Sequence, residues 1–186
     1  MSPADAITDG LARGMDVIST RFDEGTVFLP QILAASLAME SAIAIMEPYM
    51  TSDDRVSLKG VVVMGSVKGD IHEIGKNVCC AMMRGAGYKV IDLGPDVSSH
   101  DFVNAALENN ADIVGCSALM TVSLIQQKDV VRVFKEEDAT TMLIFGGAPC
   151  SQEWVDEIGG DGYSASGTEI VELVRRLIPS KVQDSP

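Results

Sequence analysis

The chain has 186 residues, 46% of them hydrophobic, which suffices for one domain of ordinary size with a small attachment and argues against global disorder. The formal net charge of −13 and the sequence pI near 4.4 argue against a nucleic-acid backbone or an anionic membrane as the main partner. No stretch has the length and unbroken apolarity of a transmembrane helix, and the first residues lack a signal-peptide pattern, so we expect a cytoplasmic protein.

The first 50 residues predict two helices. The first covers residues 3–22, where Pro3 stands at the first helical position and apolar residues recur at helical spacing. The second covers residues 27–50 and is apolar around most of its circumference, so we expect it to be buried on more than one side. Its methionines suit core packing better than a ligand lid.

Two helices alone cannot bury this much apolar surface, because helical domains usually bury it in bundles of about four helices. Two arrangements are open: the pair lies across the rest of the chain, or two copies of the chain join their helix pairs in one four-helix bundle. Residues 51–59 are polar and lack periodicity, and they predict a linker.

From Gly60 onward, apolar runs alternate with helical stretches. Strands are expected at 61–64, 88–93, 112–116, 141–145 and 162–163. Helices are expected at 75–86, 99–110, 122–137, 151–159 and 167–178. Such alternation implies right-handed crossovers and a parallel sheet. The prediction is an α/β fold, with a five-stranded, doubly wound domain over residues 60–186 after the linker and a helical segment over residues 1–50.

The four cysteines show no paired spacing of the zinc type. Cys79 and Cys80 are adjacent, which makes a disulfide between them awkward. We interpret these two, together with Cys116 and Cys150, as reduced and mostly buried thiols.

Four loops should meet at the carboxyl end of the predicted sheet, where open α/β sheets bind ligands. They are 65–75, 94–96, 117–123 and 146–150. In the first loop, Asp70 stands two residues before His72, one of only two histidines in the chain. The carboxylate could hold one ring nitrogen while the other faces a metal or a proton; the alternative is an ordinary surface loop.

The later loops offer hydroxyls and glycines. Ser117, Thr121 and Ser123 could donate to a ligand, or they could simply cap the helix that follows. Gly146 and Gly147 would let a ligand approach the backbone closely.

The combination of these motifs resembles a known family. Residues 69–75, Gly-Asp-Ile-His-Glu-Ile-Gly, match the D-x-H-x-x-G fingerprint of cobalamin-binding domains, and Ser117-x-Leu119 and Gly146-Gly147 follow in the order that this family uses. The chain resembles the corrinoid proteins of anaerobic methyltransferase systems and is similar to the cobalamin module of methionine synthase, whose fold is flavodoxin-like or Rossmann-like. Residues 22–31 also look like part of the family's helical cap.

The resemblance implies cobalamin bound in the base-off, His-on state. His72 would be the lower ligand to cobalt, Asp70 would hydrogen-bond it, and Ser123 would extend that relay. Other residues would bind the cofactor, most of them around its displaced nucleotide tail, with Tyr163 to Ala165 closing the end of the tail slot. This cofactor-binding set comprises Gly65, Asp70, His72, Gly75, Ser117, Leu119, Thr121, Gly146, Gly147 and Ala165.

The function implied is that of a methyl carrier, cycling between cob(I)alamin and methylcob(III)alamin. A substrate:corrinoid methyltransferase would load the methyl group, and a second methyltransferase would pass it to tetrahydrofolate or coenzyme M. A reductive activase is a further expected partner. The chain would be one component of an O-, N- or S-demethylase system and not a complete enzyme alone.

Two other classes of function fit the sequence less well. A cobalamin-dependent sensor would need a DNA-binding module, and the sequence shows no basic helix-turn-helix. The cobalamin subunit of a mutase is disfavoured by the helical cap. The family's cap is a bundle of four helices and only about half of it is present here, so we expect a homodimer that pairs through residues 3–50.

Overall fold

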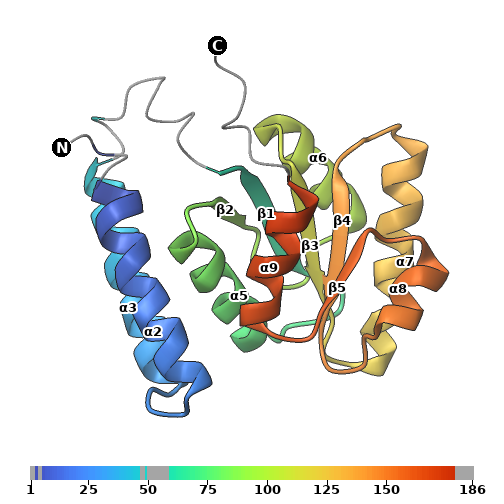
Figure 1. Ribbon diagram of the computed structural model, residues 1–186. Helices are drawn as coiled ribbons and strands as arrows, with labels where there is room; N and C mark the ends of the chain where they lie inside the picture. Colours follow the sequence, from blue (N-terminus) through green and yellow to red (C-terminus); the bar gives the residue numbers. More distant parts are fainter. Residues whose placement is uncertain (1–2, 4–5, 47–48, 50–58, 179–186) are drawn as a thin grey trace.

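The computed structural model describes residues 3, 6–46, 49 and 59–178. Two helices at the N-terminal end stand beside an α/β domain (Figure 1). The first begins as a π-helix, η1 (Ala6–Leu11), and continues as α2 (Ala12–Asp23); α3 (Leu29–Met46) returns antiparallel to it. The predicted helix over 3–22 therefore has a π-helical start. Most of the predicted linker, residues 51–58, lies outside the described residues.

The α/β domain contains one parallel sheet of five strands, which confirms the predicted fold class. The strands are β1 (Val61–Ser66), β2 (Lys89–Asp92), β3 (Ile113–Ser117), β4 (Met142–Gly146) and β5 (Gly162–Ser164). The helices between and after them are α5 (Ile74–Gly85), α6 (Ser99–Asn109), α7 (Thr121–Glu136), α8 (Gln152–Ile158) and α9 (Gly167–Leu177). The strand order is β2-β1-β3-β4-β5.

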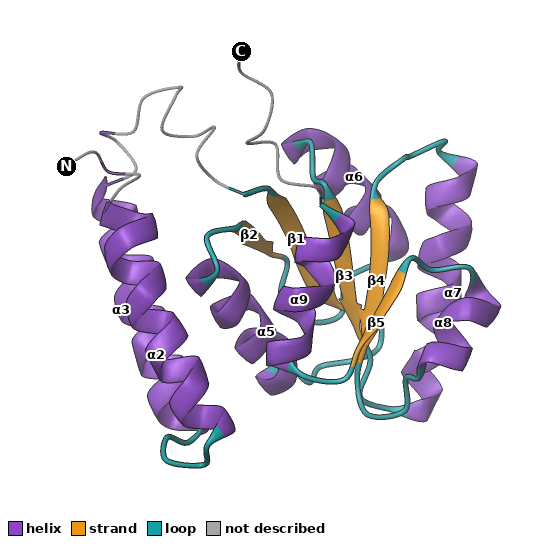
Figure 2. Ribbon diagram, viewed as in Figure 1, coloured by secondary structure: helices purple, strands orange, loops and turns teal. Residues whose placement is uncertain are grey.

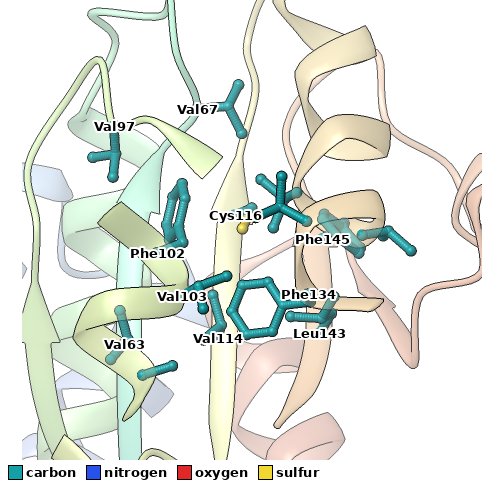
Figure 3. Close-up of a cluster of buried hydrophobic side chains, with 14 of the residues drawn as sticks. Val63, Val67, Val97, Phe102, Val103, Val114, Cys116, Phe134, Leu143 and Phe145 are labelled. Carbon is teal, nitrogen blue, oxygen red and sulfur yellow. The ribbon is translucent and has the colours of Figure 1, made fainter. Parts of the chain in front are cut away.

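Helices cover both faces of the sheet (Figure 2). One core lies between the sheet and α6, α7 and α8, and it includes Phe102, Phe134 and Phe145 (Figure 3). The other lies between the sheet and α5 and α9. Because both faces are covered, the central strands read as continuous apolar runs, as buried parallel strands do.

The N-terminal helix pair packs on the outer side of α5. Ile32 of α3 is fully buried there against Val78, Ala81 and Met82 of α5. A Cβ atom on Gly85 would lie 2.5 Å from the Cβ of Met15, so the glycine allows α2 to approach α5 closely. The structure thus shows the pair lying against the α/β domain, one of the two arrangements left open above.

The four cysteines are free thiols, three of them buried and Cys79 partly so. Within the described residues, no helix combines the length and the apolarity needed to cross a membrane.

Candidate functional site

The strand order 2-1-3-4-5 places a topological switch point between β1 and β3, because the chain leaves these neighbouring strands toward opposite faces of the sheet. The loops that follow their carboxyl ends flank this point. Asp70 and His72 lie in the loop after β1, and Leu119 to Ser123 lie in the loop after β3 and the first turn of α7.

Asp70 connects these two loops. Its Oδ1 accepts hydrogen bonds from the backbone amide of His72 (3.0 Å) and from the ring Nδ1 of His72 (2.8 Å). Its Oδ2 accepts from the Ser123 hydroxyl (2.6 Å) and from the amides of Leu119 (2.7 Å) and Met120 (3.3 Å). The side chain is completely buried. Both carboxylate oxygens are therefore fully used.

The pKa of Asp70 is held well below its usual range. Burial alone would raise this pKa, but the hydrogen bonds from Ser123, from the amides of His72 and Leu119, and from the His72 ring outweigh burial because they stabilise the charged form. The amides of Leu119 and Met120 also belong to the N-terminal end of α7, where the helix dipole favours a negative charge. Asp70 is thus a carboxylate in the native protein.

This carboxylate fixes the tautomer of His72. An ionised carboxyl group can only accept, so the Nδ1 of a neutral His72 carries the proton and Nε2 carries the lone pair. The imidazole side chain is 46% exposed. Nε2 is consequently the nitrogen that can ligate a metal.

Two residues that the sequence analysis gave no role shape the His72 loop. Ser66, buried at the end of β1, donates its hydroxyl to the carbonyl of His72 (2.7 Å). Asp96 accepts from the amide of Gly69 (2.7 Å), and its own amide donates to the carbonyl of Asp70 (2.9 Å). Asp96 has a φ of 53°, in the left-handed region that Asp tolerates better than most residues. The sequence did hold a signal for Asp96: a residue type that tolerates the left-handed conformation, in a loop expected at this edge of the sheet.

The remaining predicted residues spread along the same edge. Ser117 is in register with Gly146 of β4, which is in register with Ser164 of β5. Thr121 and Leu119 are exposed at the start of α7, and Ala165 is exposed just after β5. The structure thus places Ser117 and Gly146 side by side, with Thr121 and Ser123 on the helix that follows β3.

Three glycines differ in their surroundings. A Cβ atom on Gly147 would lie 1.8 Å from the carbonyl oxygen of Ala118, so the loops after β3 and β4 touch there and only glycine fits. Gly65 faces the ring of Phe102, 2.8 Å from a built Cβ, and thus lies inside the core beside α6. Gly75 is exposed in the first turn of α5, with no atom within 4 Å of its built Cβ.

Large apolar side chains are exposed near His72. They belong to the same loop, the start of α5 and the first turns of α7: Ile71 (74%), Ile74 (65%), Leu119 (46%), Val122 (77%) and Ile125 (53%). A single neutral imidazole with an oriented lone pair, in an apolar setting, fits a metal held in a large macrocycle that fills its other ligand positions. The residues present therefore fit a cobalt corrinoid.

Comparisons with known proteins agree with this chemistry. Two family models match, each described as a B12 binding domain, over residues 1–47 and 60–175. A corrinoid protein of Desulfitobacterium hafniense is 42% identical over 178 residues, covering 94% of this chain and 82% of the relative. The dimethylamine corrinoid protein of Methanosarcina barkeri is 40% identical over 181 residues, covering 96% and 84%.

A solved structure supports the same relationship. The crystal structure of the methanol:cobalamin methyltransferase complex from Methanosarcina barkeri contains a chain that is 30% identical, with a TM-score of 0.86. The match covers 95% of this chain and 67% of that one. The similarity therefore includes both the helical segment and the α/β domain.

Proposed function

Since the chain belongs to the B12-binding corrinoid proteins of methyltransferase systems, we propose that it carries a methyl group between two methyltransferases. A substrate-specific methyltransferase would load the group, and a second would pass it to an acceptor such as tetrahydrofolate or coenzyme M. The observation that carries the proposal is the hydrogen-bonded series His72–Asp70–Ser123, which leaves one imidazole nitrogen for a metal. Bound cobalamin would supply the cobalt that takes up and releases the methyl group.

His72 Nε2 is the proposed protein ligand to cobalt. Asp70 holds the proton on Nδ1 and fixes the ring orientation, which makes Nε2 a stronger donor. Ser123 holds the other oxygen of Asp70, so neither the carboxylate nor the ring can turn freely. This arrangement would suit the base-off, His-on state, in which His72 would ligate cobalt in place of the cofactor's own base.

The displaced nucleotide tail then needs its own place, which we call the tail site. We define it by Ser117, Thr121, Gly146 and Gly147, with Ala165 at its end. The register of Ser117 with Gly146 supports this placement, since it puts a hydroxyl and a glycine side by side next to the switch point.

A homodimer through residues 3–50 is part of the proposal. Leu37 and Ile45 of α3 are 63% and 71% exposed, although α3 packs on α2 and α5 with its other side. These two positions are eight residues apart, a little over two turns, and so lie on the same broad face of the helix. A second copy of the same apolar face would bury them, and the low charge of α3 allows it to face itself.

The ligand assignment can be tested without an activity assay. The full chain, labelled with nitrogen-15, is reconstituted with unlabelled cobalamin and reduced to the paramagnetic Co(II) form. We expect the nitrogen hyperfine pattern of the electron paramagnetic resonance spectrum to change with protein labelling, because the axial nitrogen belongs to His72. The change should vanish in His72→Ala and persist in His100→Ala. If the labelled wild type gave the same spectrum as the unlabelled protein, the assignment would be refuted.

The carrier role is tested by adding the reconstituted chain to a methylamine methyltransferase, its isotopically labelled substrate and an acceptor-side methyltransferase. Methylamine enzymes come first because relatives are named dimethylamine and trimethylamine corrinoid proteins. We expect labelled methyl to reach the acceptor only when the chain is present. Transfer that does not depend on the chain would contradict the carrier role.

A further inference from the structure

Gln127 is a buried polar residue that the site described above does not use. It lies on α7, four residues after Ser123, so both side chains project from the same face of the helix one turn apart. Its side chain is fully buried. A buried carboxamide without partners costs free energy that an apolar side chain of similar size does not. The hydrogen-bond partners of Gln127 therefore decide whether its burial costs stability.

The carboxamide is saturated with hydrogen bonds. Its Nε2 donates to the carbonyl of Cys116 at the end of β3 (3.2 Å) and to the carbonyl of Gly146 at the end of β4 (3.0 Å). Its Oε1 accepts from the indole Nε1 of Trp154 in α8 (3.0 Å) and from the thiol of Cys150 (3.5 Å). Carbonyls only accept and an indole N–H only donates, so just one orientation of the amide satisfies all four groups.

These contacts converge on the two loops that carry the tail site. Gly146 O also accepts from the amide of Ala118 (3.1 Å), so one carbonyl joins the loop after β3 to α7 and to β4. Ala118 in turn touches Gly147, where no side chain fits. Gln127 thus holds the ends of β3 and β4, which carry Ser117 and Gly146 of the tail site, at a fixed spacing.

We propose that Gln127 is a positioning residue that sets the spacing between the ends of β3 and β4 and thereby the affinity of this edge for the cofactor's nucleotide tail. This inference rests on the tail site of the proposed function. A purely structural role would lower stability without distinguishing ligands that have a tail from those that lack one.

The test compares two corrinoids on the full chain without cofactor. Cobalamin carries the nucleotide tail and cobinamide lacks it, and binding of each is followed by absorbance titration. In Gln127→Met, which keeps the volume but loses all four hydrogen bonds, we expect the Kd for cobalamin to rise about tenfold, the effect of losing one to two ordered contacts. The Kd for cobinamide should stay within about twofold. The matched control is Gln126→Met, the same substitution one residue away, which should change neither.

Two further readouts keep the inference falsifiable. Hydrogen exchange of the Ala118 amide in the cofactor-free protein should accelerate in Gln127→Met and not in Gln126→Met. Should Gln127→Met fail to fold, Trp154→Phe removes one donor and keeps an aromatic, though smaller, side chain, and we expect it to lower the preference for cobalamin by about threefold.

The outcomes separate the two claims. An unchanged ratio of the two Kd values in both Gln127→Met and Trp154→Phe would overturn the role of Gln127, with the tail site intact. Equal binding of cobalamin and cobinamide by the wild type would overturn the tail site itself, and with it the inference.

Discussion

At the scale of single residues, the Asp70 carboxylate accepts most of the hydrogen bonds that order the site. Five hydrogen bonds converge on it, two on Oδ1 and three on Oδ2. The carboxylate is buried and charged, so its hydrogen bonds to fixed donors hold it in one orientation. Its hydrogen bond to Nδ1 then holds the His72 ring in one orientation as well. The geometry of the site therefore depends on residues other than the proposed cobalt ligand.

Asp96 is one such residue, and the effect of its hydrogen bond and backbone conformation on stability can be separated from the effect of its charge. Asp96→Ala should lower the free energy of unfolding by about 1–2 kcal/mol, since it removes the acceptor for Gly69 and puts a poorly suited residue at φ 53°. Asp96→Asn keeps an oxygen acceptor and tolerates the same φ, so it should stay within about 0.5 kcal/mol of the wild type. Urea denaturation of the cofactor-free protein measures both. Equal losses in the two variants would contradict this account.

The buried thiols predict a pH dependence of stability. Burial raises the pKa of the Cys80 thiol to about 12, with a further contribution from Asp92, and that of Cys150 to about 11. Below an ordinary thiol pKa of about 8.5 both states hold these protons. Above it the unfolded chain ionises first, so stability should fall as pH rises toward 11, by at most about 1.4 kcal/mol per pH unit for each thiol.

This dependence is checked by denaturation between about pH 7 and pH 10, where these thiols titrate in the unfolded chain but not in the native protein. Cys150→Ala should flatten the decline, because one of the ionising groups is gone. A decline as steep as in the wild type would show that other groups cause it.

At the scale of elements, α5 and α7 do the positioning. Along α7, Ser123 contacts Asp70 and Gln127 contacts the ends of β3 and β4, so one rigid helix ties the histidine loop to the neighbouring loops. At the start of α5, the fully buried Lys76 pairs with Asp92 at the end of β2, and Asp92 also accepts from the amide of Gly94 (2.9 Å). This pair fixes the start of α5, two residues after His72.

The pair between Lys76 and Asp92 predicts an asymmetry between its two partners. Asp92→Asn leaves a buried ammonium for which, among the described residues, Glu73 at 3.5 Å is the remaining countercharge, so it should cost about 3–5 kcal/mol of unfolding free energy. Lys76→Met leaves a carboxylate that is 25% exposed to water and should cost less, about 1–2 kcal/mol. Denaturation of the two variants gives the comparison, and the reverse order would contradict it.

At the scale of the whole molecule, the N-terminal helices and the α/β domain form one packed unit with an apolar face left over on α3. The packing on α5 buries Ile32, while Leu37 and Ile45 remain exposed. The expected dimer uses that remaining face.

Leu37→Glu should therefore shift the protein from dimer to monomer without unfolding the single chain, because the side chain is already exposed within one chain. Light scattering at micromolar concentration measures the mass. Leu107→Glu is the matched control, since Leu107 is 55% exposed on α6 and should leave the dimer intact. A wild type that scatters as a clean monomer would refute the dimer.

The sequence by itself determined the strands, the helices and the family of this protein. Buried parallel strands are local apolar runs, so β1 to β5 could be found from a few residues each, and the Asp70–His72 motif lies within one loop. The tertiary structure alone decided that Asp70 meets the amide of Leu119, 49 residues away. It also decided that Gln127 joins β3, β4 and α8, and that Asp96 closes the histidine loop. Such bonds join residues far apart in the chain, so they depend on how loops, strands and helices pack together and cannot be read from a few neighbouring residues.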